Sequence, residues 1–479
     1  MEPHVLLVSF PMQGHVNPLL RLGRRLAARG LLVTFSTVRL PGLRDVPEDG
    51  ACADVGLGRL RFEYMRDGGG SRSYMAPDDM LSHVAAVGPP ALAELVGRQA
   101  DAGRPVTFVV NNIFVPWALD VAAGIGIPCA MLWIQPCSVL SIYYHFYKSP
   151  EAFFPTAAEP DVRVALPGLP VMAMDDMPYM VRPEFAQSLW GETIRAQVGA
   201  IQKTVSWVLV NSFDALERSA LEALRAHTPV KLMPIGPLLE HDHDDGEDDA
   251  LAQAPVAEDD DGCIAWLDAQ LPHSVVYVAF GSLVNIGRDE TAAMAEGLVA
   301  TERPFLWVVR DDSRELIPEA VLEACSDRGK VTAWSPQGRV LRHGAVGCFV
   351  THCGWNSIME ALAAGVPVVG YPWWSDQHTN AKFLVEDYKV GVRLPAPVAG
   401  DELRAFVDRV MSGPEAAVLK RRAMDWKREA AAAVADGGSS DRSLQDFVDH
   451  VRRSSRSVEL ARLAQEIEII NGPVNPVLV

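Results

Sequence analysis

Apolar residues near the start of the chain follow two different spacings. Residues 4–10 (HVLLVSF) and 31–37 (LLVTFST) are short, nearly continuous apolar runs of the kind that form buried strands. Between them, residues 19–30 (LLRLGRRLAARG) have Leu at helical spacing and end in Gly, which predicts a helix. The intervening PMQGHVNP at 11–18 is predicted to be a loop. This order predicts a βαβ unit and therefore a parallel sheet covered by helices.

The alternation continues in two blocks. Buried-type strands are expected at 105–110, 129–134 and 207–210, and MPIGPLL at 233–239 is interpreted as the exit from the first block. The second block is predicted to have a strand at 274–280, a helix at 288–300, a strand at 304–310 and helices to about residue 436. A chain of 479 residues, 49% of them hydrophobic, is too long for one core and fits two domains of roughly 200–250 residues.

An acidic segment separates the two blocks. Residues 241–262 contain ten Asp or Glu, and like charges at this density repel one another and do not form a core. We interpret the segment as a mobile loop. The alternative is a metal-binding or protein-binding segment in which His241 and His243 are ligands.

Charge and cysteine content exclude several classes of function. The net charge of −18 and the absence of a basic stripe argue against binding to nucleic acid or to an anionic membrane surface. The first residues have no basic segment typical of a signal peptide, and no run of about 18 uninterrupted apolar residues would span a membrane. Seven scattered cysteines without a C-x-x-C pair predict reduced thiols and a cytoplasmic protein.

The most informative segment is residues 334–377, WSPQGRVLRHGAVGCFVTHCGWNSIMEALAAGVPVVGYPWWSDQ. A strand (GCFVTH) ends in a polar turn (CGWNS), which opens a helix that stops at Gly365. A second strand (PVVGYP) then leads to Trp373, Trp374, Asp376 and Gln377. The turn brings backbone N–H groups and the positive end of a helix to one point, where a phosphate group binds well. Polyol-binding side chains at the end of the next strand would face the same crevice.

This segment resembles the signature box of plant family-1 UDP-dependent glycosyltransferases. The resemblance is carried by W-x-P-Q, H-x-x-x-G-x-F-x-T-H-C-G-W-N-S, the following E and G-V-P, and the final D-Q. It implies the α/β GT-B fold, in which two Rossmann-like domains with parallel sheets face each other across a cleft. The expected layout is an acceptor-binding domain at 1–240, the acidic loop at 241–262 and a UDP-sugar-binding domain at 263–436. A helix at 437–452 would cross back onto the first domain, and the tail at 455–479 has no assigned role.

The resemblance also implies a donor site for UDP-glucose. Trp334 would stack on uracil near Gln337, and Glu360 would accept both ribose hydroxyls. The diphosphate would be held by His352, Asn356, Ser357 and the Gly281–Ser282 turn, so that no metal is needed. The residues expected to contact the sugar are Trp355, Trp374, Asp376 and Gln377. Gln at position 377 goes with glucose in this family.

The implied general base is His15, in the first turn after a strand. The family commonly orients this histidine with an Asp, but the equivalent position in this chain is Asn112. An Asn forms hydrogen bonds but does not stabilise imidazolium by charge. A phenol has a pKa near 10, whereas a carboxylic acid, with a pKa near 4, arrives ionised; this difference corresponds to roughly 8 kcal/mol of deprotonation. Asn112 therefore favours carboxylate acceptors, which a protonated His15 would attract, and β-glucose ester products. The alternative is that Asn112 has only a structural role and shapes the loop.

Short matches elsewhere, such as RFEYMRDG, resemble the clade that esterifies hydroxycinnamic and benzoic acids. A small aromatic acid is therefore the expected acceptor, and a monomer is expected. The candidate acceptor pocket comes from the first domain: Met12, Gly14, Trp133, Gln135, Tyr143, Tyr144, Tyr179 and Trp190.

Other functions share parts of this pattern. A dinucleotide-dependent dehydrogenase would need G-x-G-x-x-G after the first strand, where PMQGHVNP stands instead. A phenol glucosyltransferase and a non-catalytic UDP-sugar-binding protein both remain compatible with the sequence.

Overall fold

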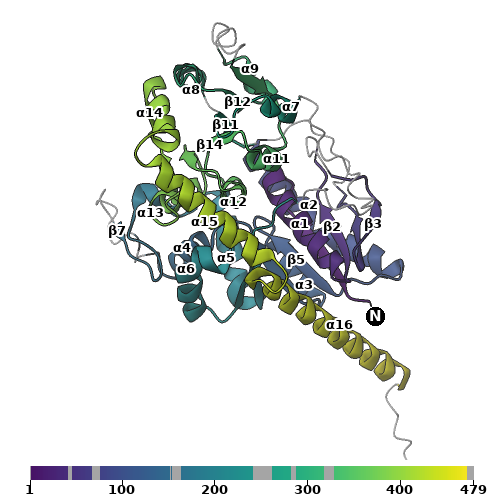
Figure 1. Ribbon diagram of the computed structural model, residues 1–479. Helices are drawn as coiled ribbons and strands as arrows, with labels where there is room; N and C mark the ends of the chain where they lie inside the picture. Colours follow the sequence, from purple (N-terminus) through teal and green to yellow (C-terminus); the bar gives the residue numbers. More distant parts are fainter. Residues whose placement is uncertain are drawn as a thin grey trace, which may run out of the picture.

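Two parallel sheets, each covered by helices, make up the computed structural model of the chain (Figure 1). The structure describes residues 2–40, 46–66, 76–150, 153, 163–240, 262–281, 287–317 and 328–471. The predicted acidic loop at 241–262, with His241 and His243, and the end of the tail therefore lie almost entirely outside the described residues.

The first sheet has eight strands in the order β10-β9-β6-β5-β1-β2-β4-β3, all parallel except for the β3–β4 pair. Its strands are β1 (His4–Ser9), β2 (Leu32–Thr37), β3 (Cys52–Val55), β4 (Gly58–Phe62), β5 (Phe108–Asn112), β6 (Cys129–Trp133), β9 (Trp207–Val210) and β10 (Lys231–Pro234). Its helices are α1 (Gln13–Ala28), α2 (Pro77–Asp101), α3 (Trp117–Gly124), α4 (Cys137–Lys148), α5 (Leu189–Lys203) and α6 (Asp214–His227). A small excursion between α4 and α5 carries β7 (Arg163–Val164), β8 (Met172–Ala173) and the 3₁₀ turns η2 (Met174–Asp176) and η3 (Tyr179–Val181).

The second sheet has six parallel strands in the order β13-β12-β11-β14-β15-β16. They are β11 (Val275–Ala279), β12 (Phe305–Val308), β13 (Gly329–Thr332), β14 (Val346–Thr351), β15 (Val368–Gly370) and β16 (Gly391–Arg393). The helices are α7 (Cys263–Asp268), α8 (Arg288–Ala300), α9 (Asp311–Arg314), α11 (Gln337–Arg342), α12 (Trp355–Ala364), α13 (Gln377–Glu386), α14 (Gly400–Met411) and α15 (Ala416–Val434). Two facing sheets of this kind confirm the predicted GT-B class.

The last helix, α16 (Ser439–Asn471), returns to the first sheet, where it packs against β5 and β10, and its far end projects from the body (Figure 1). Phe447 packs edge-on against Phe108, and His450 stacks on Trp207 with ring centroids 4.6 Å apart. Of the described helices, α2 has the length and apolar composition to cross a membrane. A third of its most apolar 18-residue stretch is buried, and α2 packs against α3 and α5.

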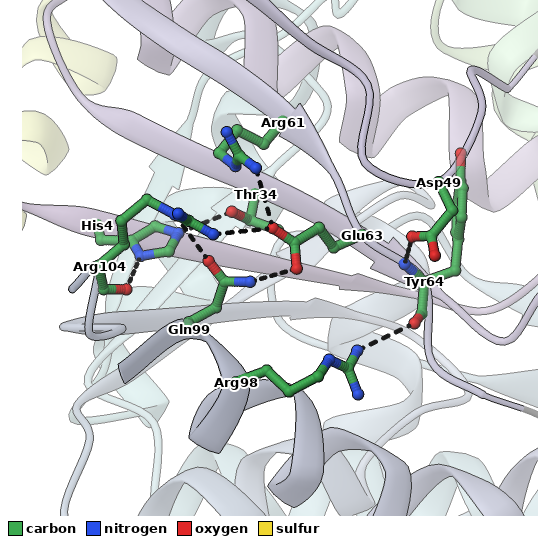
Figure 2. A network of polar contacts seen from close by, with 9 residues as sticks. All are labelled: His4, Thr34, Asp49, Arg61, Glu63, Tyr64, Arg98, Gln99 and Arg104. Atoms are coloured by element: carbon green, nitrogen blue, oxygen red, sulfur yellow. Dashed lines mark hydrogen bonds and ion pairs between the residues drawn. The ribbon is translucent and has the colours of Figure 1, made fainter. Parts of the chain in front are cut away.

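The amino-terminal end of β1 holds a buried polar network (Figure 2). The His4 side chain is fully buried, and its Nδ1 and Nε2 lie 2.8 Å from the Arg104 carbonyl and from Thr34 Oγ1. Nearby, Glu63 binds Arg104, Arg61 and Gln99. Burial lowers the pKa of His4 to about 4, which the hydrogen bond to Arg104 only partly offsets. Both ring nitrogens are satisfied, so this end of the strand is structural.

Candidate active site

The loop predicted after the first strand is instead the start of α1. The helix begins at Gln13, directly after β1, so His15 lies in its first turn. Pro18 lies inside the helix and has no N–H, so the carbonyl of Gly14 four residues earlier lacks its α-helical partner. That carbonyl accepts a hydrogen bond of 2.9 Å from Asn356 Nδ2, which belongs to α12 of the other domain. The Pro and Gly that predicted a loop thus provide a contact between the two domains.

His15 lies in an aromatic cluster at the carboxyl ends of β1 and β5. Its ring centroid is 5.4 Å from that of Phe10 and 5.3 Å from that of Phe114. Trp190 packs edge-on against Phe114 at 4.8 Å and against Trp374 at 5.5 Å, which brings the predicted acceptor and sugar ends together. Phe114 has a φ of 72°, a left-handed conformation that is strained for a bulky residue and typical of functional sites.

The imidazole of His15 has an unusual hydrogen-bonding state. Its Nδ1 is buried and has no hydrogen-bond partner in the described part of the chain. Burial lowers the pKa of His15 to about 3, and the nearby backbone of Ile113 opposes this shift only in part. The lowered pKa favours a neutral His15 at pH 7 before an acceptor binds, whereas the sequence suggested a protonated one.

Asn112 ends β5 and is fully buried. Its Oδ1 accepts from the Phe10 N–H at 3.1 Å, and its Nδ2 donates to Ser9 Oγ at 3.1 Å and to the His15 backbone carbonyl at 3.0 Å. The side chain therefore fixes the backbone that carries His15 rather than orienting the imidazole, which is a correction to the role considered from the sequence. An Asp at this position would lack the N–H groups for the two donated bonds.

The predicted phosphate turn lies between β14 and α12. The imidazole of His352 is flanked by two glycines: a Cβ at Gly354 would lie 2.4 Å from its Nε2, and one at Gly281 would lie 2.9 Å from the same atom. Burial lowers the pKa of His352 to about 4. Cys353 has a φ of 64°, and its carbonyl accepts from Asn380 at 2.9 Å. Ser282, predicted to hold the diphosphate, lies outside the described residues.

The predicted ribose end is connected by hydrogen bonds. Gln337 Nε2 donates to Ser357 Oγ at 3.0 Å and to Glu360 Oε2 at 2.8 Å. The other oxygen of Glu360 binds the guanidinium of Arg21, which comes from α1 of the first domain. Trp334 is half-buried, and its carbonyl accepts from Thr332. The ribose end thus combines residues predicted from the signature segment with one that the sequence did not single out, Arg21.

The predicted sugar end lies at the start of α13. Gln377 Oε1 accepts the backbone N–H groups of Trp373 at 2.8 Å and Trp374 at 2.9 Å, so its amide NH₂ takes no part in these two bonds. Asp376 accepts from Asn380 Nδ2 at 2.7 Å. Burial raises the pKa of Asp376, and hydrogen bonds, foremost that from Asn380, oppose the rise.

Trp355 departs from its predicted contact with the sugar. Its indole is buried and donates to the carbonyl of Asn211, beyond β9, at 2.7 Å. Trp355 therefore joins the two domains through its indole.

The predicted acceptor residues divide into two groups. Trp190 belongs to the cluster around His15, and its Nε1 donates to Asp78 at 2.6 Å. Near Asp376, Gln135 contacts Ser375, and the buried hydroxyl of Tyr143 has no partner among the described residues. The Tyr179 backbone N–H donates to the Ser375 carbonyl at 2.9 Å.

The remaining predicted acceptor residues are placed less directly. Met12 precedes α1 and packs on the core, and a Cβ at Gly14 would meet only Asn356 at 3.9 Å, so no described protein atom requires glycine there. Trp133 is fully buried and donates to the Pro136 carbonyl. Tyr144 points away from the cleft, because its hydroxyl donates to the carbonyl of His227.

Phe10, Phe114 and Asn380 belong to the site but were not predicted from the sequence. Phe10 directly follows β1 and Phe114 lies two residues after β5, at the edge where a parallel sheet carries its functional residues. Asn380 lies four residues after Asp376 on one face of α13, a spacing that predicts contact. No group of three or more His, Cys, Asp or Glu among the described residues is arranged to hold a metal ion.

Comparison with known proteins identifies the family. The model described as "UDP-glucoronosyl and UDP-glucosyl transferase" matches residues 170–420. The chain is 40% identical to a cinnamate beta-D-glucosyltransferase from Fragaria ananassa, covering 95% of this chain and 84% of that protein. It is 38% identical to a gallate 1-beta-glucosyltransferase from Quercus robur, covering 98% and 96%. A crystal structure of Os79 from O. sativa in complex with UDP has a TM-score of 0.79 and 30% identity, covering 93% and 100%. The chain therefore belongs to the UDP-glucoronosyl and UDP-glucosyl transferase family, as the signature at 334–377 predicted.

Proposed function

We propose that this enzyme transfers glucose from UDP-glucose to the carboxylate of a small aromatic acid and releases a 1-O-β-glucose ester. Two relatives of the chain are named for cinnamate and for gallate, both aromatic acids, and the second name specifies the 1-β position. Gln377 supports glucose as the sugar through the family resemblance.

The observation that carries the proposal is the environment of His15. A base that takes a proton from a phenol needs a pKa closer to that of the phenol, near 10, and a group that stabilises the resulting cation. Burial lowers the pKa of His15 to about 3, and Asn112, the side chain that donates to its backbone carbonyl, is neutral. An ionised acid needs neither property, because it has no proton to lose.

In the proposed reaction, a carboxylate oxygen attacks C1 of glucose on the face opposite UDP. A new C1–O bond forms, the bond from C1 to the β-phosphate oxygen breaks, and UDP leaves with the electron pair. His15 positions the acceptor carboxylate by a hydrogen bond, and the aromatic ring of the acceptor packs among Phe114, Trp190 and Trp374. No proton transfer is required.

The residues around α12 would bind the leaving group. Backbone N–H groups at the start of this helix and the neutral His352 would donate hydrogen bonds to the diphosphate. Glu360 would accept the ribose hydroxyls, and Trp334 would stack on uracil. We infer from this set that the transfer needs no metal ion, and from the sequence that the enzyme is a cytoplasmic monomer.

The test is release of UDP from UDP-glucose with a panel of aromatic acids and size-matched phenols, followed by mild alkali on each product. We expect turnover mainly of the acids and products that alkali cleaves. Alkali-stable glucosides made from the phenols would overturn the acceptor class. Binding of UDP-glucose without any turnover would favour a binding protein instead.

A further inference from the structure

Helix α1 carries a row of arginines on one face. Arg21, Arg25 and Arg29 are spaced four residues apart, which places them one above another along the helix. At the start of the same helix is His15. The row therefore runs from the region of the proposed acceptor towards the far end of the helix.

Two of these arginines hold the connections between the domains. Arg25 donates to the carbonyls of Ile235 at 3.2 Å and Pro237 at 2.9 Å, in the segment that leaves the first sheet. Arg29 forms an ion pair with Asp441 at the start of α16, the helix that returns. Both connections are thus fixed on α1.

Arg21, the third, reaches the donor site. Its NH1 donates to the Leu238 carbonyl at 3.1 Å, and NH1 and NH2 lie 3.3 and 3.2 Å from Glu360 Oε1. The side chains of Arg21 and Glu360 are only 14% and 11% exposed, so this ion pair is poorly screened by solvent. It joins the two domains at the carboxylate assigned to ribose.

We propose that Arg21 is a positioning residue of the donor site, which holds the Glu360 carboxylate in the orientation that the two ribose hydroxyls need. This proposal rests on the proposed function, because it takes Glu360 as the ribose acceptor. Arg21 acts through Glu360 and does not itself touch the nucleotide.

The number of hydrogen bonds that a carboxylate accepts explains how Glu360 can bind both Arg21 and the ribose hydroxyls. A carboxylate accepts about four hydrogen bonds. Arg21 takes two positions on Oε1, and Gln337 takes one on Oε2. The NH1 contact is the longest and is shared with the Leu238 carbonyl, so it is the one that yields to a hydroxyl. One position on each oxygen is then free for the ribose, while NH2 keeps the charge paired.

The experiment is calorimetric binding of UDP and of 2′,3′-dideoxy-UDP, which lacks both ribose hydroxyls, to the full-length chain. For Arg21→Gln we expect UDP to bind about five- to tenfold more weakly, the loss typical of one hydrogen bond, while binding of the dideoxy nucleotide is unchanged. Arg25→Gln is the matched control, since it lies on the same face but does not touch Glu360; we expect it to leave the ratio of the two affinities unchanged. Arg21→Lys keeps the charge and is expected to recover part of the loss.

Three results would overturn the proposal. Equal weakening of both nucleotides by Arg21→Gln would indicate a general charge effect, and a changed ratio in Arg25→Gln would indicate a disturbed helix. A further loss of UDP affinity when Arg21→Gln is added to Glu360→Gln would show that Arg21 does not act through Glu360. If the unaltered chain bound both nucleotides equally, the assignment of Glu360 to ribose would fail first, which separates failure of the donor site from failure of Arg21.

Discussion

Two histidines near opposite ends of the first strand show how the same residue serves structure at one end and chemistry at the other. His4 is fully buried, and both ring nitrogens have partners within 2.8 Å (Figure 2). His15 is half-buried among aromatic rings, and its buried Nδ1 has no partner in the described part of the chain. Burial lowers the pKa of both rings, to about 4 and about 3. The depressed pKa therefore does not distinguish them; the satisfied hydrogen bonds do.

The largest expected effect separates the two histidines by substitution. His15→Ala should lower kcat/KM for an aromatic acid by only about tenfold, the loss of one positioning hydrogen bond. The residual kcat/KM for a phenol should fall by more, because any transfer to a phenol still needs a group that accepts its proton. His4→Gln should leave kcat/KM for the acid nearly unchanged, because its side chain lies away from the cleft. It should lower the free energy of unfolding by about 1–3 kcal/mol, since buried partners lose their bonds. Steady-state kinetics and denaturant unfolding provide both values. Equal losses on acid and phenol in His15→Ala would contradict the proposed difference between the two acceptors.

The pH dependence of stability gives the next effect. In the unfolded chain a histidine has a pKa of about 6.5. When folding lowers this pKa, the unfolded chain binds the proton more tightly than the folded protein does. The free energy of unfolding is therefore highest above about pH 6.5, where both histidines are neutral in either state. It falls as the pH decreases towards the folded-state pKa values, about 4 for His4 and about 3 for His15. Each should cost about 2 kcal/mol of unfolding free energy between pH 6.5 and pH 5.

The check is to repeat denaturant unfolding at pH 7 and pH 5. The free energy of unfolding of His4→Gln should fall less between pH 7 and pH 5 than that of the unaltered chain. The difference should equal the contribution of one histidine, about 2 kcal/mol. The same drop in both would mean that His4 titrates normally in the folded protein.

The smallest effect concerns Asn112. In Asn112→Asp, the donated bonds to the His15 carbonyl and to Ser9 disappear, and the carboxylate can turn to the unpaired Nδ1 of His15 and raise the pKa of its ring. The ratio of phenol to acid turnover should rise by up to about tenfold. Asn112→Ala is the control, because it also removes those bonds but adds no charge. If both variants changed the ratio alike, Asn112 would matter only for the shape of the loop.

Periodicity and the signature segment predicted the fold class and the family correctly, and α8 has the predicted bounds, 288–300. The start of α1 was predicted wrongly, because Gly14 and Pro18 are typical of loops when only neighbouring residues are considered. In the structure, the Gly14 carbonyl that lacks the N–H of residue 18 accepts a hydrogen bond from Asn356 of the other domain. The sequence also did not predict where the side chains of Trp355 and Asn112 point. Trp355 donates to a carbonyl of the first domain, and Asn112 donates to the backbone of His15. Both partners lie far away in the sequence, so no local pattern predicts these bonds. The pairing of Arg21 with Glu360 spans the two domains, and no local pattern signals it.

The acceptor class is tested most sharply with one molecule that offers both groups. With UDP-glucose and 4-hydroxycinnamate, the enzyme chooses between a carboxylate and a phenol on the same molecule, so that a difference in affinity between two compounds cannot explain the choice. The attachment position is read by NMR of the product and by its sensitivity to mild alkali. We expect the alkali-labile glucose ester as the main product. The 4-O-glucoside as the main product would show that the site ionises a phenol, and would contradict the proposed roles of His15 and Asn112.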